Sequence, residues 1–240
     1  LVFEQLYDWG IMEFCFITGK TKRAIEDHFT QDYEYIAMLK RKSKLDLAED
    51  LESFYKKLED SRVVWINQPE PKGFGEAVHR ACSFVGNEEF LAHAGDTYII
   101  TRECTHLKRL VKVHQELDAD ATLLLQKMED PRQYGIVEVE KLVAGKNYRV
   151  NKALEKPEKP TSKLAIMPIY IFRSVIFEAL EKTPLGKGGE IQLTDGIQML
   201  IDWKRKVYAI KLKTDEKRLD IGSPETYWNA LRLSYQHATR

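Results

Sequence analysis

The sequence lacks a surplus of charge of either sign. Thirty-seven Lys and Arg residues balance 37 Asp and Glu residues, so no field of the whole protein attracts nucleic acid or an anionic membrane surface. Any chemistry on phosphate groups would therefore have to use cations that lie at the site itself. No apolar run approaches the roughly 18 residues of a membrane span, and the first residues show no signal-peptide pattern. We expect a soluble, cytoplasmic protein that binds neither nucleic acid nor membrane.

Several common site signatures are missing as well. The three cysteines, Cys15, Cys82 and Cys104, have no Cys-x-x-Cys spacing, which indicates reduced and mostly buried thiols. The six histidines have no metal-ligand spacing, so a zinc site is not expected, and His93 in an apolar run is expected to be a hydrogen-bonded core residue. Without a Gly-x-Ser-x-Gly, Walker or Rossmann fingerprint, hydrolase and hydride-transfer functions lose their usual support.

Predicted strands and helices alternate in the first half of the chain. This order indicates a parallel sheet with right-handed crossovers, and 240 residues suit one domain. Strands are expected at residues 12–18, 63–66, 90–94, 121–127, 136–140, 148–155, 163–172 and 207–212. Helices are expected at residues 1–9, 21–29 with Thr21 as its cap, 33–60 with a break near Ser43, 76–84, 105–117, 174–181, 193–203 and 224–235.

Polar residues that follow predicted strands are the candidates for a site, because ligands of open α/β sheets bind at strand ends. Gln68 and the glycines of residues 69–75 could let the backbone approach a nucleotide base, although a strand-to-helix turn has the same composition without a ligand. Asp96 and Asp220 suit Mg²⁺, which prefers one or two carboxylates plus phosphate oxygens. The alternative is that each aspartate caps the turn or helix that follows it.

The tripeptide Glu155-Lys156-Pro157 is a further candidate. Its carboxylate could accept two sugar hydroxyls, and its lysine could hold a phosphate as a point charge. Against this reading, Glu-Lys-Pro is common on surfaces, and residues 158–160 repeat it immediately.

Taken in order, these segments resemble the bacterial and archaeal UTP–glucose-1-phosphate uridylyltransferases. The resemblance runs through nearly the whole chain and is most specific in Tyr-Gly-Ile-Val (134–137) and Gly-Glu-Ile-Gln-Leu-Thr-Asp (189–195). The charged helical stretch 33–60 also resembles this branch rather than the shorter thymidylyltransferases. The other matching stretches are residues 17–20, 24–29, 68–77, 95–96, 130–133, 155–157 and 220–223.

The resemblance implies a Rossmann-like nucleotidyltransferase fold, with a mixed, mostly parallel sheet flanked by helices. It implies one domain, residues 1–240, whose nucleotide-binding half is 1–118 and whose sugar-binding half is 119–240. UTP and glucose 1-phosphate would react with Mg²⁺ to give UDP-glucose and pyrophosphate, in a protein that could be a homodimer or homotetramer.

The resemblance also implies a role for individual residues. Gln68 and Gly73 would meet the uracil base, and Asp96 and Asp220 would hold Mg²⁺, with Asp96 counted among the catalytic residues. The sugar-side roles follow in the same way: Gly135 and Glu155 would bind the glucose, and Lys156 its phosphate, as a second catalytic residue.

The family's amino-terminal glycine-rich loop with its Arg, and the Lys-containing segment after it, do not occur in this sequence. We therefore expect that an amino-terminal stretch precedes Leu1 in the natural molecule. The resemblance implies activity where that stretch is present and none where it is absent.

Three other functions stay open. The protein could be a non-catalytic homologue that binds a nucleotide sugar and regulates a partner, or a thymidylyltransferase that uses dTTP. A glycosyltransferase is ranked lower, because its Asp-x-Asp metal motif is met only by Asp118-Ala119-Asp120, which leads into a predicted strand rather than ending one.

Overall fold

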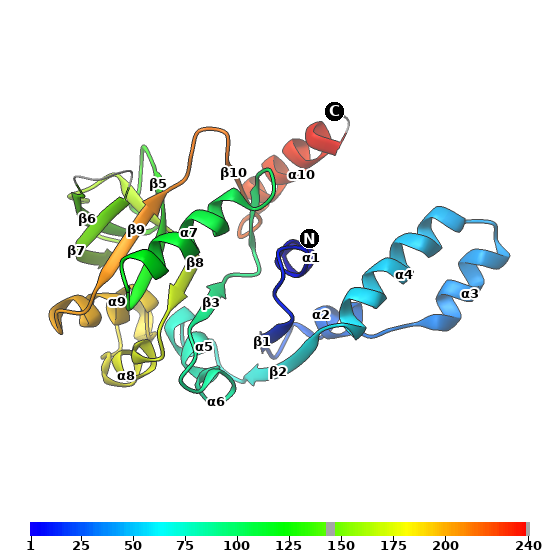
Figure 1. Cartoon of the computed structure of the whole chain (residues 1–240), viewed down its shortest axis with the longest axis horizontal. Coiled ribbons are helices and arrows are strands. Elements are labelled where there is room, and N and C mark those ends of the chain that lie inside the picture. Colours follow the sequence, from blue (N-terminus) through cyan, green and yellow to red (C-terminus); the bar gives the residue numbers. More distant parts are fainter. Residues whose placement is uncertain (143–146, 239–240) are drawn as a thin grey trace. The chain divides into compact units, whose positions relative to one another are not determined.

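The structure, a computed structural model, describes residues 1–142 and 147–238. The chain forms two compact units, Leu1–Pro71 and Lys72–Arg240, and each unit has a sheet of its own (Figure 1). The predicted nucleotide-binding and sugar-binding halves are defined by the ligands they would bind and not by how the chain packs. That division therefore stays a prediction.

The first unit is built on two parallel strands, β1 (Glu13–Gly19) and β2 (Arg62–Gln68), which pair in register from Glu13 with Arg62 to Gly19 with Gln68. Its helices are α1 (Val2–Asp8), α2 (Arg23–His28), α3 (Tyr33–Arg41) and α4 (Leu45–Glu59). Phe3, Phe14 and Phe29 belong to a cluster of aromatic rings that packs this unit together.

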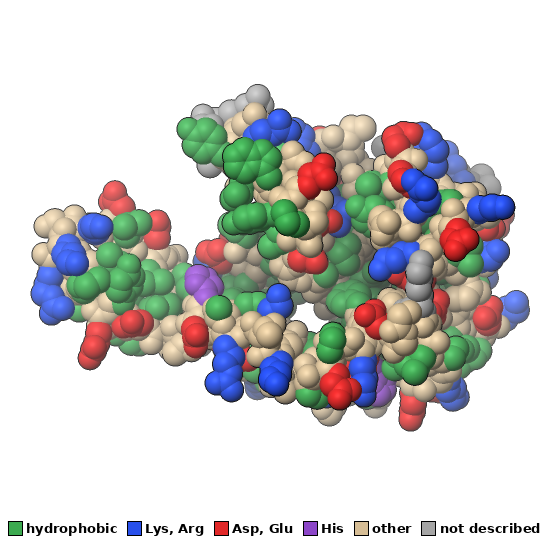
Figure 2. All heavy atoms as spheres, turned by 180° about the vertical axis from the view of Figure 1, so that it is seen from behind, with side chains coloured by type: hydrophobic (Ala, Val, Ile, Leu, Met, Phe, Trp, Pro, Cys, Tyr) green, Lys and Arg blue, Asp and Glu red, His purple; other side chains and the backbone are tan. Residues whose placement is uncertain are grey.

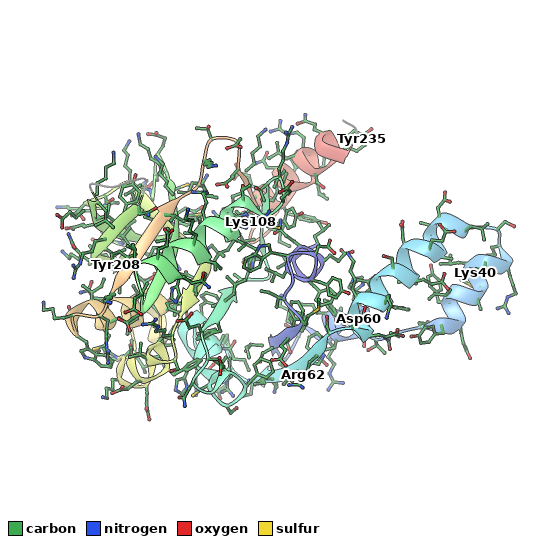
Figure 3. The ribbon with its side chains drawn as sticks, viewed as in Figure 1. Lys40, Asp60, Arg62, Lys108, Tyr208 and Tyr235 are labelled. Carbon is green, nitrogen blue, oxygen red and sulfur yellow. The ribbon has the colours of Figure 1, made fainter. Side chains whose placement is uncertain are left out.

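The helical hairpin α3–α4 turns at Ser43, whose backbone φ is 55°, close to the predicted break. Lys40 of α3 donates to Glu52 of α4 across 2.6 Å (Figure 3). Thr21 is not the cap of α2 as predicted: the helix begins after Lys22, and no side chain caps it.

The second unit contains a six-stranded sheet in the order β3-β8-β5-β9-β7-β6. Its strands are β3 (Phe90–His93), β5 (Ala121–Lys127), β6 (Gly135–Lys141), β7 (Asn147–Glu155), β8 (Leu164–Phe172) and β9 (Val207–Lys211). Strands β5 and β9 pair in parallel and their neighbours pair antiparallel. The sheet is therefore mixed, as expected, but most of its strand pairs are antiparallel, so the expectation of a mostly parallel sheet was wrong.

Helices cover both faces of this sheet, because side chains alternate along its central strands. Ala121, Leu123 and Leu125 of β5 join the core formed with α8 and α9, whereas Thr122 points to α7 and meets His114 there. The helices of this unit are α5 (Phe74–Arg80), α6 (Cys82–Val85), α7 (Thr105–Glu116), α8 (Val175–Lys182), α9 (Leu193–Asp202) and α10 (Pro224–Ala238), with a short 3-10 turn at Lys187–Gly189.

A two-stranded antiparallel sheet, β4 (Thr97–Ile100) and β10 (Lys217–Asp220), stands beside the larger one. Helix α10 follows it, and exposed apolar side chains gather on this helix (Figure 2), among them Trp228, Leu231 and Tyr235. The predicted homodimer or homotetramer stays a prediction.

Most predicted elements are present, but the strands β4 and β10 were not among the predictions. The helix expected at 76–84 is two helices, α5 and α6, which meet at Ala81. The three cysteines form no disulfide and have intermediate exposure, so most of the surface of each is buried, in line with the prediction. Within the ranges 1–142 and 147–238, no helix combines the length and the apolar character that crossing a bilayer demands.

Candidate functional site

Two acidic side chains meet where β4 begins and β10 ends. Asp220, the last residue of β10, is the register partner of Thr97, and the Ile221 amide donates to the Asp96 carbonyl over 3.0 Å. A methyl group built on Gly222 would lie 3.1 Å from Asp220 Oδ1 and 3.7 Å from Asp96 Oδ2. The antiparallel pairing thus brings the two predicted metal ligands to one glycine-lined point.

The arrangement fits a hard cation, since carboxylate oxygens are the ligands that Mg²⁺ prefers and such a site needs only one or two of them. Asp220 also has the structural role that its position suggested: its Oδ1 accepts the Gly222 amide at 2.8 Å. A carboxylate offers about four lone-pair sites; Asp220 Oδ1 also accepts the Thr226 hydroxyl at 3.4 Å and Oδ2 pairs with Arg218, so one site is left for a metal. Within the described parts of the chain, no group of three or more His, Cys, Asp or Glu could hold a metal ion.

Arg218 connects this acidic pair to the start of β6. Its guanidinium forms an ion pair with Asp220, lies 5.4 Å from the centre of the Tyr134 ring and approaches the Tyr134 hydroxyl at 3.5 Å. The side chain of Arg218 is only 10% exposed, so the ion pair is shielded from water. Neither Arg218 nor Tyr134 was among the predicted site residues.

The predicted sugar-side residues lie together at the adjoining ends of β6 and β7. Gly135 and Glu155 are directly opposite each other in the antiparallel pair, and the Lys156 amide donates to the Tyr134 carbonyl at 3.1 Å. Lys156 has a positive backbone φ of 39°, which is uncommon for a residue other than glycine. Its ammonium lies 3.5 Å from Glu155 Oε1 and its side chain is 43% exposed, so the cation is open to a ligand.

Thr194 holds the other oxygen of this glutamate. Its hydroxyl donates to Glu155 Oε2 over 2.6 Å from the first turn of α9. Burial, followed by the charge of Glu155, raises the pKa of the neighbouring Asp195 carboxyl. The same two causes raise the pKa of Tyr170, while the Arg218 guanidinium lowers it. The negative charge of Glu155 thus raises the pKa of both of these neighbours.

The segment 189–195 also supports the loop that contains Gly73. The Ile191 amide donates to the Lys72 carbonyl at 2.8 Å, and the Gly75 amide donates to the Ile191 carbonyl at 2.9 Å. Gly73 has φ 99° and ψ 167°, a region that is essentially confined to glycine. One motif therefore contacts both the predicted base-binding loop and the predicted sugar carboxylate.

Gln68 ends β2 in the first unit, whereas the other predicted site residues belong to the second unit. The structure brings Asp96, Asp220, Gly135, Glu155 and Lys156 into one connected region of the second unit, through Arg218 and Tyr134. Their proposed roles toward ligands stay predictions.

Two other candidates have structural roles. His93 donates its Nδ1–H to the Ala94 carbonyl at 2.8 Å, and burial lowers its pKa, as expected for a hydrogen-bonded core histidine. Asp118 forms ion pairs with Arg173 and Lys206, and Asp120 Oδ2 accepts the Lys206 amide at 2.8 Å. The Asp-x-Asp motif therefore connects the adjoining ends of the neighbouring strands β8, β5 and β9.

The chain is similar to known proteins along most of its length. The family profile described as nucleotidyl transferase matches residues 2–236. The UTP–glucose-1-phosphate uridylyltransferase of Bacillus subtilis is 37% identical over 92% of this chain and 74% of its own length. The enzyme of the same name from Staphylococcus epidermidis is 35% identical over 92% of this chain and 75% of its own.

Solved structures agree with these sequence relatives. A UDP-glucose pyrophosphorylase complexed with UDP-glucose superposes with a TM-score of 0.85 and 26% identity, covering 98% of this chain and 85% of that one. A UTP-bound enzyme of this kind from Acinetobacter baumannii superposes with a TM-score of 0.82 and 29% identity, covering 97% of this chain and 79% of the other. The resemblance inferred from the motifs, and the fold class, are confirmed.

Proposed function

Because this chain belongs to the nucleotidyl transferase family, we propose that it transfers a uridylyl group from UTP to glucose 1-phosphate, giving UDP-glucose and pyrophosphate. Relatives of that name share 35% and 37% of its residues, and structural neighbours contain UTP or UDP-glucose. The observation that carries the proposal is the connected region in which the carboxylates of Asp96 and Asp220 are linked through Arg218 to Glu155 and Lys156.

The proposed reaction requires little covalent chemistry from the protein. A phosphate oxygen of glucose 1-phosphate attacks the α-phosphorus of UTP in line, and pyrophosphate leaves. The attacking group is already anionic, so no general base is required. Binding must then supply orientation and charge neutralisation.

Each side chain has one task in this proposal. Glu155 accepts hydroxyls of the glucose, next to the backbone of Gly135, and Lys156 pairs with the phosphate of the sugar. Asp96 and Asp220 would hold Mg²⁺, which when bound supplies further neutralisation of phosphate charge. Gln68 and Gly73 are assigned to the uracil base, by resemblance alone.

The test uses the natural full-length protein and measures pyrophosphate release from UTP and glucose 1-phosphate in the presence of Mg²⁺, with dTTP as the competing nucleotide. We expect turnover with UTP, and a loss on the order of 100-fold in kcat for both Asp96→Asn and Asp220→Asn. Asp118→Asn is the matched control, because Asp118 has only the ion pairs described above, and it should keep full activity.

Three outcomes would contradict parts of the proposal. Full activity of both site variants would rule out the metal assignment. Preferred use of dTTP would make the protein a thymidylyltransferase. UDP-glucose binding without any turnover would select the non-catalytic homologue.

A further inference from the structure

We propose that Thr194 is a positioning residue for hexose recognition: its hydroxyl fixes the Glu155 carboxylate, and Gly135 provides the space that this hydroxyl occupies. The inference rests on the proposed function, in which Glu155 accepts sugar hydroxyls. It gives Gly135 a task that differs from direct sugar contact.

The hydrogen bond distinguishes the two oxygens of Glu155. Oε2 receives the Thr194 hydroxyl at 2.6 Å, while Oε1 faces the Lys156 ammonium at 3.5 Å. Thr194 is itself only 6% exposed, and its helix α9 is anchored by the fully buried Ile197 and Leu200. The donor is therefore immobile relative to the sheet that bears Glu155.

Gly135 is explained by space and not by backbone conformation. It is not among the glycines of positive φ, so its conformation suits any residue. A methyl group there would lie 2.5 Å from Thr194 Oγ1, 3.1 Å from Glu155 Oε2 and 3.3 Å from Ile166 Cδ1. The most severe overlap is with the hydroxyl of Thr194, which would have to leave Glu155.

A fixed carboxylate matters because an ordered side chain has less rotamer freedom to lose when the ligand binds. Without the Thr194 donor, Oε2 lies partly buried with one fewer partner. The carboxylate is then free to turn toward Lys156, which draws that cation away from the phosphate. Hexose binding should suffer more than binding of the nucleotide part.

The experiment measures dissociation constants for UDP-glucose and UDP by calorimetry, because their ratio isolates the hexose contribution. For the near-isosteric Thr194→Val, we expect the affinity for UDP-glucose to fall about 10-fold, with the affinity for UDP unchanged. Thr194→Ser keeps the hydroxyl and should retain the ratio of the unaltered protein. Unchanged binding of UDP also shows that each variant is folded.

The role of Gly135 is tested by coupling. Gly135→Ala should raise the ratio of the UDP-glucose dissociation constant to the UDP dissociation constant when Thr194 is present, and should raise it no further when combined with Thr194→Ala. Additive losses would show that Gly135 serves the sugar directly, and an unaltered ratio in Thr194→Val would overturn the positioning role alone. If the unaltered protein binds no UDP-glucose, the proposed function fails, and this inference with it.

Discussion

A buried carboxylate, Glu216, holds the segment that leads into β10. Its side chain is 1% exposed and accepts hydrogen bonds from the Thr105 hydroxyl at 2.9 Å and the Lys213 amide at 2.8 Å, with Arg109 as its ion-pair partner at 2.5 Å. Burial alone would raise the pKa of Glu216, but these donors outweigh it and hold the pKa below its usual value. Glu216 thereby fixes the start of the strand that ends at Asp220.

Replacing this residue tests that role. Glu216→Gln should lower the free energy of unfolding by about 2 kcal/mol at pH 7, because Arg109 loses its charged partner in a buried setting. Since the pKa is lowered on folding, the stabilisation is present above the unfolded pKa of about 4.3 and is lost as the pH falls below it. Urea unfolding should therefore show the difference at pH 7 and a smaller one near pH 3.

Glu129→Gln is the control for that measurement. Glu129 is 86% exposed and pairs with Lys163 at 2.8 Å, so water screens the pair and its loss should leave the free energy of unfolding nearly unchanged. Equal losses of the free energy of unfolding in Glu216→Gln and Glu129→Gln would mean that Glu216 does not hold the start of β10.

The residues of the candidate site differ in how readily they can be identified from the sequence. Asp96 and Glu155 are acidic residues beside predicted strand ends, and Asp220 lies in a stretch that matches the family, so their candidacy could be stated from position and resemblance. Thr194 lay within a recognised motif but had no role until its distance to Glu155 was known. Arg218 gave no signal, since its contacts join residues 84 positions apart.

Among the elements, the strand pair β4–β10 has the largest consequence for the site. Asp96 and Asp220 were candidates because ligands of open α/β sheets bind at strand ends. They meet because β10 ends where β4 begins, in an antiparallel pair of four residues each. β10 was missed because Lys217-Arg218-Leu219-Asp220 has little apolar character, and short strands depend on tertiary contacts.

The loop that contains Gly73 packs against Ile191, and this contact gives a prediction at the scale of secondary-structure elements. A methyl group at position 73 would lie 2.5 Å from the Ile191 carbonyl oxygen, and the glycine has φ 99°. Gly73→Ala should lower the free energy of unfolding by about 2 to 4 kcal/mol, because the backbone contact and the conformation both resist a side chain. Thermal or urea unfolding measures the loss.

Gly95→Ala is the matched substitution for comparison. A methyl group at Gly95 meets nothing within 4 Å, and its φ is not positive. This variant should unfold within about 0.5 kcal/mol of the unaltered protein. If Gly73→Ala is equally well tolerated, the loop is not held by Ile191 in solution.

At the scale of the whole molecule, packing of the second unit makes stability depend on pH. His106 of α7 is fully buried, and within the described chain neither of its ring nitrogens has a hydrogen-bond partner. Burial lowers the pKa of His106 to about 4, so the fold holds the imidazole neutral. The unfolded chain binds more protons between pH 6.5 and 4, and stability must fall as the pH drops through that window.

His106→Leu removes this titration and keeps an apolar side chain of similar size. From pH 7 to pH 5, we expect the unaltered protein to lose about 2 kcal/mol more stability than the variant, measured by urea unfolding at both values. Parallel pH profiles for the two proteins would show that His106 is not held neutral by the fold.

The overall architecture was predictable only in part. Hydrophobic periodicity identified most strands and helices, and the motifs identified the family. The order of the six strands depends on pairing between distant segments, such as β3 with β8, and local patterns do not encode it. The boundary between the two compact units at Pro71 falls in the Pro- and Gly-rich stretch 69–75, whose composition also suits a strand-to-helix turn within one unit.

A crystal structure of the protein with UDP-glucose and Mn²⁺ tests the central claim most directly, since the anomalous signal locates the metal. The account predicts a manganese peak bound by the carboxylates of Asp96 and Asp220, and glucose hydroxyls on Glu155 while its Oε2 keeps the Thr194 hydrogen bond. A manganese peak away from both aspartates, or a glucose ring that does not contact Glu155, would contradict it.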